Sequence, residues 1–76
     1  MMMITKDLPI TVDREIMSGV PVFTGTRVPV SALLENLEVG VSLDDFLDNF
    51  PTVTRDQVVR VLEHFRSELN DISLAA

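Results

Sequence analysis

Cysteine is absent from this 76-residue chain, and histidine occurs once, as His64. The lack of cysteine excludes a disulfide framework and a thiolate nucleophile, and it fits a reducing compartment. One histidine without a serine or aspartate at triad spacing gives no catalytic triad, and a zinc site would need several carboxylates. None of the three glycines belongs to a Gly-Lys-Ser/Thr phosphate loop. We therefore expect no enzymatic activity, metal site, cofactor or small-molecule substrate.

Long apolar runs and basic residues are also scarce. No apolar run approaches the roughly 20 residues that cross a bilayer, and residues 1–10 lack the basic start and apolar centre of a signal peptide. We therefore expect a cytoplasmic protein without a membrane segment. Six Lys and Arg residues against twelve Asp and Glu residues leave a net charge of -6. That sign is wrong for a protein whose whole surface follows nucleic acid.

Apolar residues, by contrast, are plentiful at 46% of the chain. A chain of this length forms one domain and has a large surface relative to its volume. Its core cannot hold every apolar side chain, so part of them should lie in an interface. A homodimer is the natural form for such a domain.

The most informative segment is a candidate β-hairpin. Two apolar runs, residues 21–23 and 28–30, flank the turn Thr24-Gly25-Thr26-Arg27. Apolar runs separated by a turn that contains glycine are typical of a hairpin. Pro21 and Pro29 lack an amide donor, so both strands should be very short or lie at a sheet edge.

Outside the hairpin, the spacing of apolar residues predicts another short strand at residues 10–12 and then three helices. In the first helix Leu33, Leu34 and Leu37 recur at helical spacing, with Ser31 as its cap and Gly40 after its end.

The second and third helices carry clearer start signals. Ser42 followed by Asp45 caps the second helix, and Pro51 stops it. Thr54 with Gln57 forms a capping box for the third. The buried faces of the two helices are expected to consist of Leu43, Phe46, Leu47 and Phe50, and of Val58, Val61, Leu62, Phe65 and Leu69.

These elements predict a mostly α fold with a small β part in a single domain, residues 1–76. Short strands and the hairpin occupy residues 4–30, and a three-helix, helix-turn-helix-like bundle occupies residues 31–70, with residues 51–53 joining its last two helices. For the tail at residues 71–76 two alternatives stay open. Either Ile72 and Leu74 extend an interface, or the tail is disordered.

Three segments carry a family resemblance: SGVPVFTGTRVPV at residues 18–30, GVSLDDFL at 40–47 and FPTVT at 50–54. Together they resemble the domain-of-unknown-function 433 family, and the resemblance extends over residues 10–69. It implies a helix-turn-helix-like antitoxin that pairs with a PIN-like ribonuclease toxin, in some members as a homodimer. Some members have a glycine where this chain has Ser18, which concerns turn geometry.

Two groups of residues are candidates for contact with a partner protein. They are the turn residues Gly25, Thr26 and Arg27, and the acidic residues Glu35, Glu38, Asp44, Asp45 and Asp48. The acidic group would complement the basic RNA channel of a ribonuclease. A plainer alternative is that Gly25 only permits a positive φ and that Arg27 pairs with an acid. Likewise, Asp44 and Asp45 suit the first turn of a helix.

The alternative function is a helix-turn-helix DNA-binding regulator. Its candidate residues surround the start of the third helix, where a recognition helix meets bases and phosphates: Thr52, Thr54, Arg55, Gln57 and Arg60. Against it, Thr54 and Gln57 can be occupied in capping, and so few arginines give little electrostatic attraction to DNA. We therefore expect an antitoxin-like, homodimeric interaction protein first and a DNA-binding regulator second.

Overall fold

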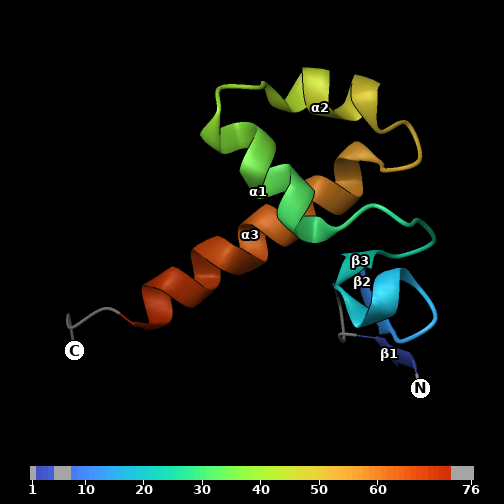
Figure 1. Ribbon diagram of the computed structural model, residues 1–76. Coiled ribbons are helices and arrows are strands. Elements are labelled where there is room, and N and C mark those ends of the chain that lie inside the picture. The colour runs from blue at the N-terminus through green and yellow to red at the C-terminus, as the bar shows by residue number, and fades with distance from the viewer. Residues whose placement is uncertain (1, 5–7, 73–76) are drawn as a thin grey trace.

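The computed structural model describes residues 2–4 and 8–72 and has the expected order of elements, a small sheet followed by helices (Figure 1). The strands are β1 (Met2–Ile4), β2 (Ile10–Asp13) and β3 (Val22–Phe23), with a 3-10 turn η1 (Met17–Gly19) between the last two. The helices are α1 (Val30–Glu38), α2 (Leu43–Asn49) and α3 (Arg55–Asp71). The mostly α fold class is therefore confirmed.

The sheet is antiparallel with β2 in the middle, in the order β1-β2-β3. Thr11 pairs with Ile4 of β1 on one side and with Val22 of β3 on the other. The expected strand at residues 10–12 is therefore present, and it extends to Asp13. Strand β1 lies mostly before residue 4, where the sequence predicted no strand. Its pairing with β2 is a tertiary contact that the local sequence did not indicate.

The predicted hairpin is present in a shortened form. The amide of Phe23 donates to the Val28 carbonyl at 3.0 Å, and the amide of Val30 donates to the Pro21 carbonyl at 2.9 Å. Only β3 is a strand, however, and the returning arm is a single bridge between Val22 and Pro29. The arm is short because α1 begins directly after that bridge.

The start of α1 differs from the prediction. Helix α1 begins at Val30 with Pro29 in the cap position and no side-chain cap, so Ser31 lies inside the helix and the predicted cap is wrong. The hairpin replaces the cap, because it already gives the Val30 amide an acceptor. At the other end Gly40 follows the helix with φ +92°, as the sequence predicted.

The caps of α2 and α3 are confirmed. The Ser42 hydroxyl accepts a hydrogen bond from the Asp45 amide at 3.1 Å. Thr54 and Gln57 form the full capping box, with each side chain bonded to the backbone of the other at 3.1 and 3.0 Å. The link between the helices is longer than expected, residues 50–54 rather than 51–53, because α2 ends at Asn49.

The core lies where β3 meets the three helices. Phe23 and Phe46 are fully buried with ring centroids 6.4 Å apart, and Phe50 stacks obliquely on Phe46 at 4.8 Å. Leu33 of α1 and Val58 and Val61 of α3 are also fully buried in this core. Burial of these side chains supplies the main stabilisation of the domain.

Not all of the predicted apolar faces are buried. Of the three leucines predicted for the apolar face of α1, Leu33 is buried, while Leu34 and Leu37 are exposed. In α3 Leu69 is 65% exposed, so its assignment to the buried face is wrong. The reason is visible in Figure 1, where the second half of α3 extends beyond the other elements. The molecule measures 41 × 33 × 19 Å as a result.

The two alternatives for the tail at residues 71–76 concern the end of α3 and the residues after it. This helix continues through Asp71, and the Ile72 that follows is 75% exposed. Leu74 lies outside the described residues. Within the described ranges, no helix combines the length and the apolar character that crossing a membrane requires.

Candidate interaction surface

The turn between β3 and α1 is held in one conformation by two residues. Gly25 has φ +81°, a value that residues with a side chain rarely adopt. Thr26 is only 8% exposed, and its hydroxyl donates to the Phe23 carbonyl at 2.8 Å while accepting from the Val28 amide at 3.0 Å. Both halves of this buried hydroxyl are therefore satisfied, and the turn is fixed from inside.

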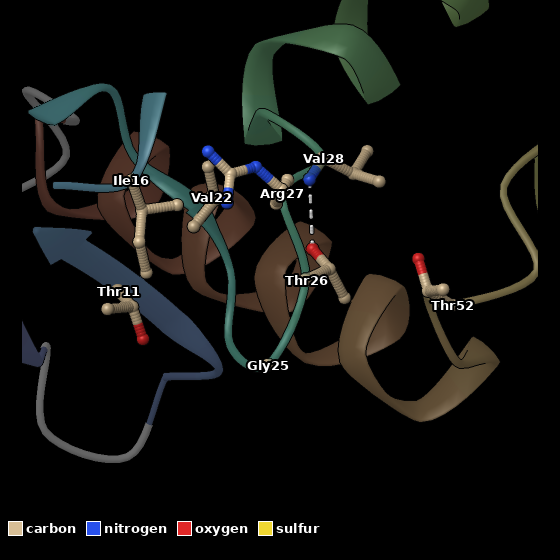
Figure 2. A pocket seen from close by; sticks show the side chains of 8 residues that line it. All are labelled: Thr11, Ile16, Val22, Gly25, Thr26, Arg27, Val28 and Thr52. Carbon is tan, nitrogen blue, oxygen red and sulfur yellow. Dashed lines mark hydrogen bonds between the residues drawn. The ribbon is translucent and has the colours of Figure 1, made fainter. Parts of the chain in front are cut away.

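The three turn candidates, Gly25, Thr26 and Arg27, line one open hollow of about 630 Å³. Figure 2 shows it between strand β2, the turn and the segment that precedes α3. Thr52, a candidate from the DNA-binding group, also lines it, on the side opposite Thr11 (Figure 2). The fold thus brings residues of two separately predicted groups to one place.

The wall of the hollow is mainly apolar. Ile16, Val22 and Val28 contribute aliphatic side chains. The hydroxyl of Thr11 is bonded to that of Thr24 at 2.9 Å, and the hydroxyl of Thr26 is occupied inside the turn. The threonines at this wall therefore offer few free polar groups.

Arg27 supplies the positive charge of the hollow. Its side chain is exposed, and in Figure 2 it is directed toward the side of Ile16 and Val22. Among the described residues no acid lies within ion-pair distance of it, so that part of the chain holds no partner for the predicted pairing of Arg27 with an acid.

The candidates at the start of α3 have structural partners. Gln57 accepts from the Thr54 amide within the capping box, and its side-chain amide donates to the Thr24 carbonyl at 2.9 Å. The second bond ties α3 to the turn across 33 residues of chain. These two side chains hold the helix start in place, which is the plainer alternative that the sequence left open.

The arginines of this group lie beside carboxylates. Arg55 donates to Asp44 at the start of α2, and Arg60 lies 3.8 Å from Asp56 one helical turn away. The first pair joins a residue predicted for DNA with one predicted for a protein partner. Each neighbouring carboxylate offsets part of the positive charge that a phosphate would meet.

The remaining acidic candidates are dispersed over two helices. Glu35 and Glu38 are exposed on α1, and Asp45 and Asp48 are exposed on α2. The backbone amide of Asp45 also donates a hydrogen bond to the Ser42 hydroxyl that caps α2. In the described part of the chain no group of acidic, histidine or cysteine side chains is arranged to hold a metal ion.

His64 has a local partner. Its Nε2 lies 3.5 Å from Glu68 on the next turn of α3, and its ring lies beside that of Phe65 with centroids 6.1 Å apart. These contacts are typical of a histidine on the side of a helix.

Sequence reasoning gave no functional role to four residues that line the hollow, namely Thr11, Ile16, Val22 and Val28. One signal was present, since Thr11 is a polar residue between two apolar ones in a predicted strand. Ile16 gave none, because its place depends on η1, where Met17 and Ser18 both take positive φ.

The fold and this surface define a small domain in which a β-hairpin is braced against a helix-turn-helix-like pair. The chain belongs to the family described as "Protein of unknown function (DUF433)", whose model matches residues 10–64. No curated protein matches the chain.

A solved structure supports the fold. The chain is similar to the crystal structure of a DUF433 member protein from Anabaena variabilis ATCC 29413 at 2.00 Å resolution, with a TM-score of 0.68 and 21% sequence identity. The match covers 87% of this chain and 65% of that one, so this chain spans about two thirds of the length of its solved relative. At this identity the likeness establishes the fold alone.

Proposed function

We propose that this chain is an antitoxin-like interaction protein that binds and neutralises a PIN-like ribonuclease toxin as a homodimer. The observation that supports the proposal most is a row of apolar side chains on the outer half of α3, formed by Phe65, Leu69 and Ile72. Phe65 is half-buried, and the other two are 65% and 75% exposed. Phe65 packs partly against the domain's own core, whereas Leu69 and Ile72 remain available to a partner.

The spacing of the row suits a partner groove. Phe65 and Leu69 lie one turn apart on the same side of α3, and Ile72, the residue that caps the end of the helix, follows at i+7 from Phe65. An amphipathic helix binds a hydrophobic groove through anchors with this spacing. Because the second half of α3 extends beyond the domain (Figure 1), a partner can surround it without displacing α1 or α2.

Charge favours a basic partner. The chain carries a net charge of -6, and the outer half of α3 holds Glu63, Glu68 and Asp71 against Arg66 as its only fixed positive charge. A ribonuclease channel that binds RNA is positively charged, and an acidic protein approaches it faster and in a preferred orientation. A protein seated there would exclude the RNA substrate.

A DNA-binding regulator is the second candidate, and the helix-turn-helix-like arrangement of α2 and α3 favours it. The carboxylates beside Arg55 and Arg60, together with the acidic charge of the chain, weigh against it. Titration of an operator duplex from the neighbouring promoter region would test this candidate. It fails if no complex forms at low salt, where phosphate contacts are strongest.

The antitoxin proposal is tested by co-expression with a PIN-like ribonuclease from the neighbouring gene. We expect the two proteins to co-purify, growth to be restored and ribonuclease activity to be inhibited. The double variant Leu69→Ser with Ile72→Ser should weaken the complex at least about tenfold, since each buried aliphatic side chain is worth roughly 1.5–3 kcal/mol.

Val39→Ser is the matched control, because Val39 is 78% exposed but lies beyond the end of α1. It should leave the affinity unchanged. Two unassociated proteins, or toxicity that this chain does not relieve, would reject the proposal. Sedimentation of the isolated chain tests the dimer separately.

A further inference from the structure

We infer that the hollow beside the Thr24–Arg27 turn is a binding site for a carboxylate attached to an apolar group. The ligand is either a small organic acid or the carboxyl end of a peptide with an apolar last residue. Arg27 would bind the carboxylate, and the aliphatic wall would bind the apolar group. This inference does not rest on the proposed antitoxin function, since it concerns the isolated chain.

The first observation is the combination of one cation with an apolar wall. Arg27 has no acidic partner among the described residues, although the chain has twice as many acidic as basic residues. A guanidinium presents a planar fork that matches a carboxylate with two hydrogen bonds. The half-buried side chains of Ile16 and Val28 offer aliphatic contact to whatever the carboxylate carries, and the fully buried Val22 lies behind them.

The second observation is that the site is preorganised. Gly25 takes the φ that the turn requires, and Thr26 holds the turn through two hydrogen bonds of its buried hydroxyl. Gln57 fixes the turn from outside by donating to the Thr24 carbonyl at 2.9 Å. The backbone that carries Arg27 is therefore held before a ligand arrives, which lowers the entropic cost of binding.

The third observation concerns size and shape. A volume of about 630 Å³ lies within the range of about 300–1,000 Å³ that is usual for ligand sites. The hollow is open rather than enclosed, so the end of a longer chain can enter as readily as a small molecule. A single arginine in an apolar setting suits a singly charged carboxylate better than a phosphate dianion, whose desolvation costs more.

The test is an NMR titration of the full chain labelled with ¹⁵N. The probes are N-acetyl-phenylalanine, its amide without a carboxylate, and inorganic phosphate. We expect N-acetyl-phenylalanine to shift the amide signals of Thr11, Gly25 and Val28, with dissociation constants of about 0.1–10 mM for so small a ligand. The amide should bind at least about fivefold more weakly, because a charge-assisted hydrogen bond is lost.

Arg27→Gln should weaken the binding of N-acetyl-phenylalanine at least about fivefold. It should leave the rest of the spectrum unchanged, since the Arg27 side chain is exposed and has no ion pair in the described structure. Arg27→Lys keeps the charge without the planar fork, so its affinity for N-acetyl-phenylalanine should lie between those of the unchanged chain and of Arg27→Gln. Arg66→Gln is the matched control, because Arg66 is also an exposed arginine but lies on α3. It should bind like the unchanged chain.

The source of the ligand is decided by a tetrapeptide that ends in phenylalanine. Tighter binding of the tetrapeptide than of N-acetyl-phenylalanine identifies a peptide end, and equal binding identifies a small acid; both support the inference. Equal binding of the amide, displacement of the acid by an equal concentration of phosphate, or signals that shift with protein concentration alone would each overturn it. None of these outcomes depends on whether the chain binds a ribonuclease.

Discussion

Arg55 at the first position of α3 forms an ion pair with Asp44 at the start of α2, 11 positions earlier in the sequence, and so links the first turns of the two helices. Each residue was a candidate for contact with a different kind of partner. Their pairing means that substitution of either one changes the surroundings of the other. Experiments that assign a role to either residue therefore need both single variants and the double variant.

We expect this ion pair to contribute little to stability. The Arg55 and Asp44 side chains are 59% and 77% exposed, so water and salt screen their attraction. A double-mutant cycle with Arg55→Ala and Asp44→Ala, measured by urea unfolding, should give a coupling of about 0.2–1 kcal/mol that falls at high salt. Arg66→Ala serves as a control for loss of an exposed arginine. A coupling of several kcal/mol that survives high salt would contradict this view.

The Thr26 hydroxyl should matter more than its size indicates. Thr26→Val keeps the shape of the side chain but leaves the Val28 amide without its acceptor in a partly buried place. We expect a loss of about 1–3 kcal/mol in the free energy of unfolding. Thr26→Ser keeps the hydroxyl and removes one methyl group, which should cost about 0.8 kcal/mol. Chemical denaturation of both variants compares the two, and an equal or larger loss for the serine variant would contradict the role of the hydroxyl.

Substitution of Ser18 should stabilise the chain. Ser18 has φ +58° inside η1, a left-handed conformation that disfavours residues with a side chain. Ser18→Gly relieves that strain, and we expect a gain of about 0.5–1 kcal/mol despite the greater freedom of glycine in the unfolded chain. Ser67→Gly is the opposite control. Ser67 is exposed within α3, where glycine should cost about 0.5 kcal/mol. The prediction fails if both variants lose stability in thermal unfolding.

Phe46 should be the most sensitive of the core positions. Its ring is fully buried between those of Phe23 and Phe50. Phe46→Ala should cost about 3–5 kcal/mol, which approaches the whole stability of about 4–11 kcal/mol expected for a chain of this length. Phe50→Ala, at a half-buried ring, should cost clearly less. Circular dichroism would then show an unfolded Phe46→Ala chain and a folded Phe50→Ala chain, and the reverse order would contradict the core as described.

Local signals in the sequence predicted local structure well. The capping box of Thr54 with Gln57, the Ser42 cap and the glycine after α1 depend on residues within a few positions of one another, and all three are confirmed. Ser31 failed as a cap because the hairpin, a contact from earlier in the chain, already gave Val30 its acceptor. Periodicity likewise placed Leu69 on an apolar face but could not indicate that nothing in the domain covers it.

The residues of the candidate site likewise fall into those that the sequence predicted and those that only the fold brought together. The sequence by itself determined the turn residues Gly25 to Arg27, the three helices, the acidic charge and the family, because composition, spacing and capping act over short distances along the chain. Only the tertiary structure decided that Thr11, Ile16 and Thr52 join the turn around one hollow, and that Arg55 meets Asp44. Those contacts join residues that are far apart in the sequence, and they form only once the buried aromatic core has fixed the elements against one another.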